Sequence, residues 1–410
     1  MTKKSDAPAI RFKGFSDAWE QRKFSELVQI ERGGSPRPID DFITDAPNGL
    51  NWVKIGDAPT QGNYITKTAE KIRPEGLSKT REVHPGDLIL SNSMSFGKPY
   101  IMGIDGCIHD GWLLIRNTYG VFDLTFLCHL LGTPQMLSQY RSLAAGSTVN
   151  NLNKELVGNT VVTIPSITEQ RVLGDYLEQL DNLITLHQRK FEKLTNVKKS
   201  MLEKMFPQNG CSYPEIRFKG FTDAWEQRKV SDLAEKTYGG GTPTTSNEAY
   251  WNGDIPWIQS SDVADGKLLG VESRKRITQD GLNNSAAQLI PENSIAIITR
   301  VGVGKLAFMP YSYATSQDFL SLSKLNAEPF FTVYACYKKL QSELNAVQGT
   351  SIKGITKDEL LAKSIMVPQY AEQRQIGAFF KQLDNLITLH QRELEKLQNI
   401  KKSMLEKMFV

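Results

Sequence analysis

Small polar and basic side chains gather in four loop-like segments of this 410-residue sequence, and these segments are the first candidates for chemistry. Asn and Gln amides match the edge of adenine, Lys and Arg match guanine or phosphate, and Ser and Thr serve either. Loops of this composition are equally typical of ordinary surface turns, so both interpretations stay open for each loop. The candidate nucleic-acid-binding residues in and beside these loops are Lys54, Ser91, Asn92, Ser95, Lys98, Thr148, Asn150, Asn151, Lys154, Gln259, Ser260, Thr299, Arg300, Lys305, Thr350, Ser351, Lys353 and Lys357.

One of these loops has a glycine pattern that is similar to a phosphate-binding loop. The run at 302–305 reads Gly-Val-Gly-Lys and so contains the Gly-Lys of a phosphate-binding loop. However, Leu306 stands where a Ser or Thr would ligate Mg²⁺, and Thr299 stands at the first glycine position. The glycine-rich run at 239–243 lacks the full dinucleotide-binding fingerprint. The sequence also lacks the Asn-Pro-Pro-aromatic motif of an adenine methyltransferase. No catalytic residue is predicted.

The four cysteines, at positions 107, 128, 211 and 336, form no Cys-x-x-Cys pair. This spacing argues against a zinc module, a redox motif or a disulfide framework, and it favours a reducing compartment. The start, MTKKSDAPAI, lacks the apolar core of a signal peptide, and no run approaches the roughly 18 apolar residues of a membrane span. We therefore expect a soluble cytoplasmic protein that binds no metal and no cofactor of its own.

The charge distribution gives no support for nucleic-acid binding. The formal net charge is +4, and the two central segments are slightly acidic: Lys plus Arg number 12 against 14 Asp plus Glu at 24–164, and 13 against 14 at 230–367. Nucleic-acid binders usually concentrate basic side chains on one face. Charge alone therefore predicts no such function.

The sequence is internally duplicated. Residues 10–23 (IRFKGFSDAWEQRK) return at 216–229 with one change, from Ser to Thr, and residues 169–206 return with few changes at 372–409. The segments between the copies share only a few residues at matching positions. A plain tandem duplication would explain the copies, but it leaves the contrast between the conserved and the diverged parts unexplained. One framework that carries two different recognition domains explains both.

A seven-residue apolar repeat runs through both copies of the second block and predicts two long helices of about 57 Å each. An isolated helix with an apolar seam is unstable in water, so we expect the two helices to pair as an antiparallel coiled coil. A metal or catalytic role for the two histidines of the seam is the alternative, but no carboxylate or cysteine cluster shares their face. The seam residues are Leu173, Leu180, His187, Leu194 and Met201 in the first helix, and Ile376, Leu383, His390, Leu397 and Met404 in the second.

Strand-like apolar runs alternate with turns in both diverged segments, and each segment also has one helix-like stretch, near 126–143 and 331–347. The predicted fold class is α+β, with two mixed α/β, strand-rich recognition domains joined by the two long helices in a pseudo-twofold internal repeat. Blocks around Trp19 and Trp225 could contact phosphates, but packing at the base of each domain is the preferred interpretation. The predicted organisation is an N-terminal segment at 1–23 that repeats 216–229, a recognition domain at 24–164, a helix at 165–206, a linker and repeated segment at 207–229, a second recognition domain at 230–367 and a helix at 368–410.

This layout resembles the specificity subunit of type I restriction-modification systems over essentially the whole chain. The residues that carry the resemblance are the duplicated IRFKGF(S/T)DAWEQRK blocks, the Trp-x-x-x-x-Asp pairs Trp52/Asp57 and Trp257/Asp262, the Pro-x-x-x-Glu-Gln-Arg entries at 165–171 and 368–374, and the LDNLITLHQR helices.

The resemblance implies a non-catalytic subunit that reads a bipartite, asymmetric double-stranded DNA target, with one half-site per recognition domain. It also implies that the helices dock two methyltransferase subunits and, through them, restriction and translocase subunits. S-adenosyl methionine would then bind to the methyltransferase subunits and not to this chain. A stand-alone sequence-specific DNA-binding or architectural protein is the alternative, and a self-contained nuclease or methyltransferase is a third that lacks the motifs it needs.

Overall fold

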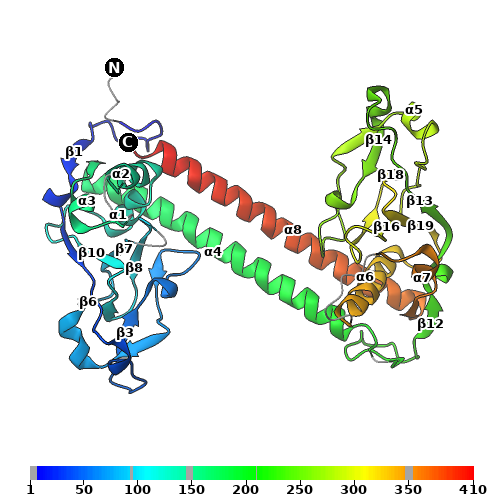
Figure 1. Ribbon diagram of the computed structural model, residues 1–410, viewed down its shortest axis with the longest axis horizontal. Coiled ribbons are helices and arrows are strands. Elements are labelled where there is room, and N and C mark those ends of the chain that lie inside the picture. Colours follow the sequence, from blue (N-terminus) through cyan, green and yellow to red (C-terminus); the bar gives the residue numbers. More distant parts are fainter. Residues whose placement is uncertain (1–6, 93–95, 145–150, 209, 347–353) are drawn as a thin grey trace. The chain divides into compact units, whose positions relative to one another are not determined.

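The computed structural model describes residues 7–92, 96–144, 151–208, 210–346 and 354–410, which fall into two compact units (Figure 1). Unit 1 consists of residues 1–189 and 391–410, and unit 2 of residues 190–390. Both long helices contribute to both units. The recognition-domain boundaries predicted from the sequence stay predictions, because each compact unit also takes in segments of the long helices.

Unit 1 is built on a five-stranded sheet with the strand order β2-β10-β7-β8-β4 and a four-stranded sheet with the order β5-β3-β9-β6, and β1 pairs with β11. Strands β7, β8 and β10 are runs of buried residues, as is typical of strands covered on both faces. The elements are β1 (Glu20–Lys23), β2 (Gln29–Arg32), β3 (Leu50–Val53), β4 (Tyr64–Ile65), β5 (Glu70–Ile72), β6 (Arg81–Val83), β7 (Leu88–Ser91), β8 (Pro99–Met102), β9 (Gly106–Ile108), β10 (Trp112–Arg116), α1 (Leu124–Leu131), α2 (Pro134–Ala144), α3 (Lys154–Gly158), β11 (Val161–Ile164) and the first part of α4 (Ile167–Lys204).

Unit 2 repeats this plan with a four-stranded sheet in the order β13-β19-β16-β17, a three-stranded sheet in the order β15-β14-β18, and the pair β12-β20. The central strand of the smaller sheet is parallel to one neighbour in both units, β3 to β9 and β14 to β18. The elements are β12 (Glu226–Lys229), β13 (Ala234–Gly239), β14 (Trp251–Ile258), β15 (Lys275–Ile277), α5 (Gln279–Asn283), β16 (Ser294–Ile298), β17 (Leu306–Met309), β18 (Ala314–Thr315), β19 (Phe319–Leu325), α6 (Pro329–Ala346), α7 (Lys357–Leu361), β20 (Ser364–Val367) and the first part of α8 (Tyr370–Lys407).

The helix that follows β19 in unit 2 is continuous, whereas its counterpart after β10 in unit 1 is broken. The single helix α6 corresponds to α1 and α2, which are separated at Gly132 and Thr133. Pro134 begins α2, and proline suits the first turn of a helix because it lacks the N–H that would have no partner there. The helix-like stretch expected near 126–143 is therefore two helices.

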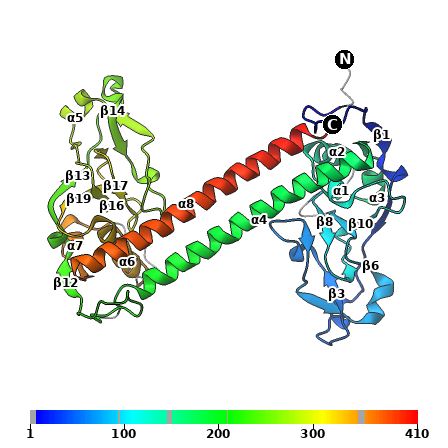
Figure 2. The same cartoon turned by 180° about the vertical axis from the view of Figure 1, so that it is seen from behind.

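The long helices contact each other in both units and run in opposite directions there (Figure 2). In unit 1, Lys401 of α8 pairs with Asp181 of α4, while the carbonyl of Lys407 accepts a hydrogen bond from the N–H of Ile10 at 3.0 Å. In unit 2, Lys198 Nζ of α4 lies 2.5 Å from Asp384 Oδ1 of α8. The antiparallel pairing expected from the heptads is therefore present in each unit.

The predicted seam positions differ in burial along each helix. The first two are buried in the core of their unit, which holds for Leu173 and Leu180 in unit 1 and for Ile376 and Leu383 in unit 2. The last two of each helix are half-buried against the cores, and the two histidines are half-exposed. The half-buried residues are Leu194, Met201, Leu397 and Met404, and the half-exposed histidines are His187 and His390.

The Glu-Gln-Arg entry of each long helix binds two segments of its unit, the duplicated block and the residue just before α1 or α6. In unit 1, the guanidinium of Arg11 makes two bonds, of 2.7 and 2.8 Å, to the buried carboxylate of Glu169. The side chain of Gln170 accepts a hydrogen bond from the N–H of Asp123 at 3.0 Å, just before α1. Arg217, Glu372 and Gln373 repeat these contacts in unit 2.

A glycine in each long helix allows this close approach. A Cβ at Gly174 would lie 2.9 Å from the N of Phe126, and one at Gly377 would lie 2.8 Å from the N of Phe331. Any other residue at either position would force the first turn of α1 or α6 away from the long helix.

The duplicated Trp blocks pack at the base of each unit. Trp19 is 4% exposed, and its ring lies 6.4 Å from the rings of both Phe126 and Phe409. Trp225 is 3% exposed and lies 6.0 Å from Phe206. The packing role preferred for these tryptophans is confirmed.

In the part of the chain that the structure describes, no helix is both long enough and apolar enough to cross a membrane. The same residues hold no group of three or more His, Cys, Asp or Glu side chains placed to bind a metal ion.

Candidate nucleic-acid interface

The Trp-x-x-x-x-Asp pair builds a fixed turn in each unit. In unit 1, Trp52 is 1% exposed, and Asp57 Oδ2 accepts a hydrogen bond from the N–H of Lys54 at 2.8 Å. In unit 2, Asp262 Oδ2 accepts the corresponding bond from the N–H of Gln259 at 3.0 Å. The Trp and the Asp are therefore framework, whereas the residue that the turn presents differs between the units.

A Gly-Gly-Ser/Thr-Pro segment lies beside this turn in both units. A Cβ at Gly33 would lie 2.2 Å from the carbonyl oxygen of His109, and one at Gly240 would lie 1.8 Å from that of Ser316, so only glycine permits this contact. The hydroxyl that follows is used in the same way in both units. Ser35 Oγ donates to Asp110 Oδ1 at 3.0 Å, and Thr242 Oγ1 donates to Gln317 Oε1 at 2.6 Å.

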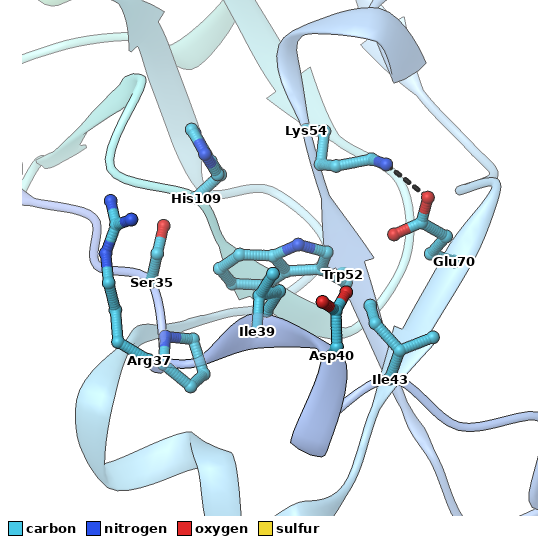
Figure 3. Close-up of a pocket in the computed structure, with 10 residues that line it drawn as sticks. Ser35, Arg37, Ile39, Asp40, Ile43, Trp52, Lys54, Glu70 and His109 are labelled. Carbon is cyan, nitrogen blue, oxygen red and sulfur yellow. Dashed lines mark hydrogen bonds and ion pairs between the residues drawn. The ribbon is translucent and has the colours of Figure 1, made fainter.

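In unit 1 these elements enclose a cavity of about 670 Å³ (Figure 3). Figure 3 shows Ser35, Arg37 and His109 on one side and Lys54 with its ion-pair partner Glu70 on the other, with Trp52 and Ile39 between them. His109 Nε2 lies 3.0 Å from Asp110 Oδ1, and Arg37 Nη2 lies 4.0 Å from Asp110 Oδ2. The cavity is therefore lined by two cations, Arg37 and Lys54, each placed beside a carboxylate, and by the imidazole of His109.

Two further loops join the same edge of each unit. In unit 1, Asn92 Nδ2 donates to the carbonyl of Asp110 at 2.8 Å, and the N–H of Leu152 donates to the carbonyl of Asn92 at 3.0 Å. In unit 2, Thr299 Oγ1 donates to the carbonyl of Asp318 at 3.0 Å, and the N–H of Ile355 donates to the carbonyl of Thr299 at 2.7 Å. We call these converging segments the loop edge, which comprises residues 35–37, 54, 70, 92, 109–110 and 152 in unit 1, and 242–244, 259, 275, 299, 316–318 and 355 in unit 2.

The candidate residues chosen from the sequence fall into three structural groups. Ser91, Asn92 and Thr299 are buried, and their hydrogen bonds brace the loops. Lys98 and Lys305 are half-buried and follow glycines that pack against the neighbouring helices. The half-buried or exposed remainder comprises Lys54, Asn151, Lys154, Gln259, Ser260, Arg300 and Lys357.

Six candidate residues lie outside the described residues. They are Ser95, Thr148, Asn150, Thr350, Ser351 and Lys353.

Several polar residues of the loop edge were not predicted from the sequence. In unit 1 they are Ser35, Arg37, Glu70, His109 and Asp110, and in unit 2 they are Thr242, Lys275 and Gln317. The signal was present in the matching GGSP and GGTP segments at 33–36 and 240–243. Aligning those two segments would have placed their hydroxyl residues at one equivalent position.

Comparison with known proteins supports the architecture. The type I restriction modification DNA specificity domain model matches residues 16–196 and 222–399. The type I restriction enzyme MjaVIII specificity subunit of Methanocaldococcus jannaschii is 21% identical over 94% of this chain and 95% of its own length. The EcoR124I/EcoR124II specificity subunit of Escherichia coli is 31% identical over 43% of this chain and 45% of its own length.

A solved structure shows that the fold is shared. The crystal structure of the type I restriction-modification S subunit from M. genitalium covers 98% of this chain and 99% of that chain, with a TM-score of 0.66 at 14% identity. The duplicated units, the two long helices and the two matched segments together lead to one assignment: the chain belongs to the type I restriction-modification DNA specificity family.

Proposed function

We propose that each unit of this specificity subunit reads one half of a bipartite, asymmetric DNA target through its loop edge. One observation carries the proposal: the two loop edges have the same backbone framework but different side chains at equivalent positions. Lys54 corresponds to Gln259, because each N–H is held by the framework Asp, and Asp110 corresponds to Gln317, because each accepts from the framework hydroxyl. Side chains with different donors and acceptors recognise different base edges.

We also propose that the long helices dock two methyltransferase subunits and, through them, the restriction subunits. Each LDNLITLHQR block leaves leucines exposed at matching places: Leu183 and Leu186 at 43% and 45%, and Leu386 and Leu389 at 38% and 52%. A partner present in two copies needs two copies of one surface, and exposed apolar groups are typical of interaction sites. In this proposal S-adenosyl methionine binds to the methyltransferase subunits, and this chain contributes no catalytic group.

Exchange of one recognition domain tests the reading function. Residues 230–367 are replaced by another recognition domain of the family, the chain is co-expressed with its methyltransferase, and methylated adenines are mapped across the host genome. We expect one half of the methylated sequence to change and the other to persist. A change in both halves would contradict the modular proposal.

Substitution of the exposed leucines tests docking. Leu186→Glu with Leu389→Glu should abolish co-purification of the methyltransferase and leave the melting temperature of the chain unchanged. Tyr119→Glu is the matched control, because Tyr119 is 68% exposed and lies outside the helices. Tight sequence-specific DNA binding by the purified chain alone, without methyltransferase, would instead favour a stand-alone DNA-binding protein.

A further inference from the structure

We infer that three pairs of equivalent positions in the loop edges, 54/259, 70/275 and 110/317, determine which base pair each unit requires. Unit 1 reads a G·C pair at these positions, and unit 2 reads an A·T pair. The inference rests on the proposed function and goes further, because it names the side chains and the base pair for each half-site.

The equivalence of the positions follows from contacts that recur in both units. Residues 54 and 259 each follow the buried Trp by two positions and are held by the framework Asp. Residues 70 and 275 lie opposite that Trp on the neighbouring strand, since Trp52 pairs with Glu70 and Trp257 pairs with Lys275. In the third pair, Asp110 accepts a hydrogen bond from the hydroxyl of Ser35, and Gln317 accepts one from the hydroxyl of Thr242. The side chains therefore differ at positions whose backbone is the same.

In unit 1 each cation of the loop edge stands beside a carboxylate. Lys54 pairs with Glu70, and their side chains are 36% and 38% exposed. Arg37, 82% exposed, lies 4.0 Å from Asp110, which is 32% exposed. The O6 and N7 of guanine accept from Lys or Arg, and the N4 amine of cytosine donates to a carboxylate, so such a pair matches both bases of one G·C pair.

The same arrangement disfavours an A·T pair. The carboxylate would then face the O4 oxygen of thymine, and the cation would face the N6 amine of adenine. A contact between two acceptors or two donors leaves desolvated groups unpaired, which is how an interface rejects a wrong partner.

Unit 2 presents amides in place of these charges. Gln259 is half-buried and Gln317 is exposed, and a Gln side chain offers one donor and one acceptor that match N7 and N6 of adenine. Lys275 replaces the carboxylate and lies 5.5 and 6.0 Å from the ring centroids of Trp251 and Trp257. A cation held against two aromatic rings suits a contact to a phosphate. Because Lys275 stands where unit 1 has Glu70, unit 2 has no carboxylate at the position that would accept from the N4 amine of cytosine.

A reciprocal exchange of side chains tests the inference. Lys54→Gln with Glu70→Lys and Asp110→Gln gives unit 1 the residues of unit 2 at the three pairs, and Gln259→Lys with Lys275→Glu and Gln317→Asp does the reverse. Each variant, in complex with the methyltransferase, methylates a library of DNA targets in which each recognised base pair is randomised in turn. We expect one base pair of the corresponding half-site to change from G·C to A·T, or from A·T to G·C, with a change in preference of about 5-fold to 150-fold.

The control is the same kind of charge exchange away from the loop edge. Arg22 and Glu20 form an exposed ion pair in β1, so Arg22→Gln with Glu20→Lys should leave the methylated sequence unchanged. If the first exchange destabilises unit 1, Lys54→Arg and Lys54→Gln are compared with Glu70 kept. The Lys54→Arg variant should retain the preference for a G·C pair, and the Lys54→Gln variant should lose it.

The remaining outcomes separate this inference from the proposed function. An unchanged methylated sequence in both exchanged variants, with methylation retained, would overturn the inference, and so would loss of methylation on every target by an intact complex. A change in the half-site of the other unit would contradict the modular function itself.

Discussion

At the junction between the recognition domain and the long helices, unit 1 has His129 where unit 2 has Tyr334. Both side chains face an ion pair between the two helices: Asp181 with Lys401, which is half-buried, in unit 1, and Asp384 with Lys198, which is buried, in unit 2. Tyr334 Oη donates to Asp384 Oδ2 at 2.6 Å. His129 Nε2 lies 3.6 Å from Asp181 Oδ2 and is among the buried atoms of the described residues that have no hydrogen-bond partner.

This difference shows which side of the junction can vary. In unit 1 a side chain from the recognition domain, Asn63, donates to Asp181 Oδ2 at 2.8 Å and takes the place that the tyrosine hydroxyl has in unit 2. Removing one partner of a buried ion pair is costly, because the other charge stays desolvated. The ion-pair residues of the long helices are therefore the same in both units, whereas the recognition domain supplies a different hydrogen-bond donor to the carboxylate in each unit.

The most direct way to break this comparison is to remove the shared carboxylate. Asp384→Ala leaves the charge of Lys198 without its carboxylate, although Nζ keeps its hydrogen bond to the carbonyl of Gly266 at 3.1 Å. Because the Lys198 side chain is only 10% exposed, we expect a loss of about 3–5 kcal/mol from the free energy of unfolding of unit 2. Asp181→Ala should cost less, because Lys401 is 21% exposed and can be hydrated. Hydrogen exchange, followed separately for peptides of each unit, measures both losses. Equal losses below about 1 kcal/mol would contradict the role of the pair.

Exchanging the third group sharpens the comparison. Tyr334→Phe removes a hydrogen bond to a buried carboxylate, so we expect a loss of about 1.5–3 kcal/mol. His129→Phe removes a ring nitrogen that makes no such bond, and the free energy of unfolding of unit 1 should stay the same or rise. Denaturant unfolding of the two variants decides between these outcomes. A larger loss for His129→Phe would show that the histidine supports the ion pair after all.

The two units should also differ in their response to acid. Burial, reinforced by Lys401, lowers the pKa of His129 from 6.5 to about 4. The unfolded chain therefore takes up the proton first as the pH falls, so the stability that unit 1 has above pH 6.5 is lost between pH 6.5 and pH 4. By pH 5.5 we expect a loss of about 1 kcal/mol in unit 1.

The control for this loss is the variant that lacks the histidine, His129→Phe. Hydrogen exchange at pH 7.5 and pH 5.5 should show the change in unit 1 of the native chain and not in His129→Phe. If the variant kept the same pH dependence, another group would be responsible.

The smallest effect is expected at the break between α1 and α2, the other difference between the units. Pro134 is exposed, and Thr133 Oγ1 caps α2 by accepting from the N–H of Met136 at 3.3 Å. Pro134→Ala should therefore cost only about 0.4–1 kcal/mol, chiefly through the greater freedom of the unfolded chain. Circular dichroism should show an unchanged helix content, since the cap keeps the helices separate. A clear gain in helix content would mean that the proline alone causes the break.

The parts of the fold that the sequence predicted are those with a local periodicity. The heptads predicted both long helices, and strand-like apolar runs of the first diverged segment correspond to β7, β10 and β11. The parallel pairing of β3 with β9 joins residues more than fifty positions apart, as Trp52 with Cys107. No local pattern carries that information.

The candidate site was predicted only in part, for a related reason. Composition identified Lys54 and Gln259, but it could not distinguish a polar side chain that faces solvent from one that braces a loop, as Asn92 does. Ser35 and Asp110 meet across 75 positions of sequence, so neither suggested the other. Comparing the two diverged segments position by position carries more information about the site than the composition of either.

The packing of Phe409 against Trp19 and Phe126 has a consequence for how the chain is made. Residues 190–390 are contiguous, so unit 2 can close as soon as they have left the ribosome, whereas unit 1 needs residues 391–410. At translation rates of about 5–20 residues per second, roughly 10–40 s separate the synthesis of the two parts of unit 1. The apolar base around Trp19 stays uncovered during that interval and is open to chaperones and to aggregation. The unit that is synthesised first is completed last.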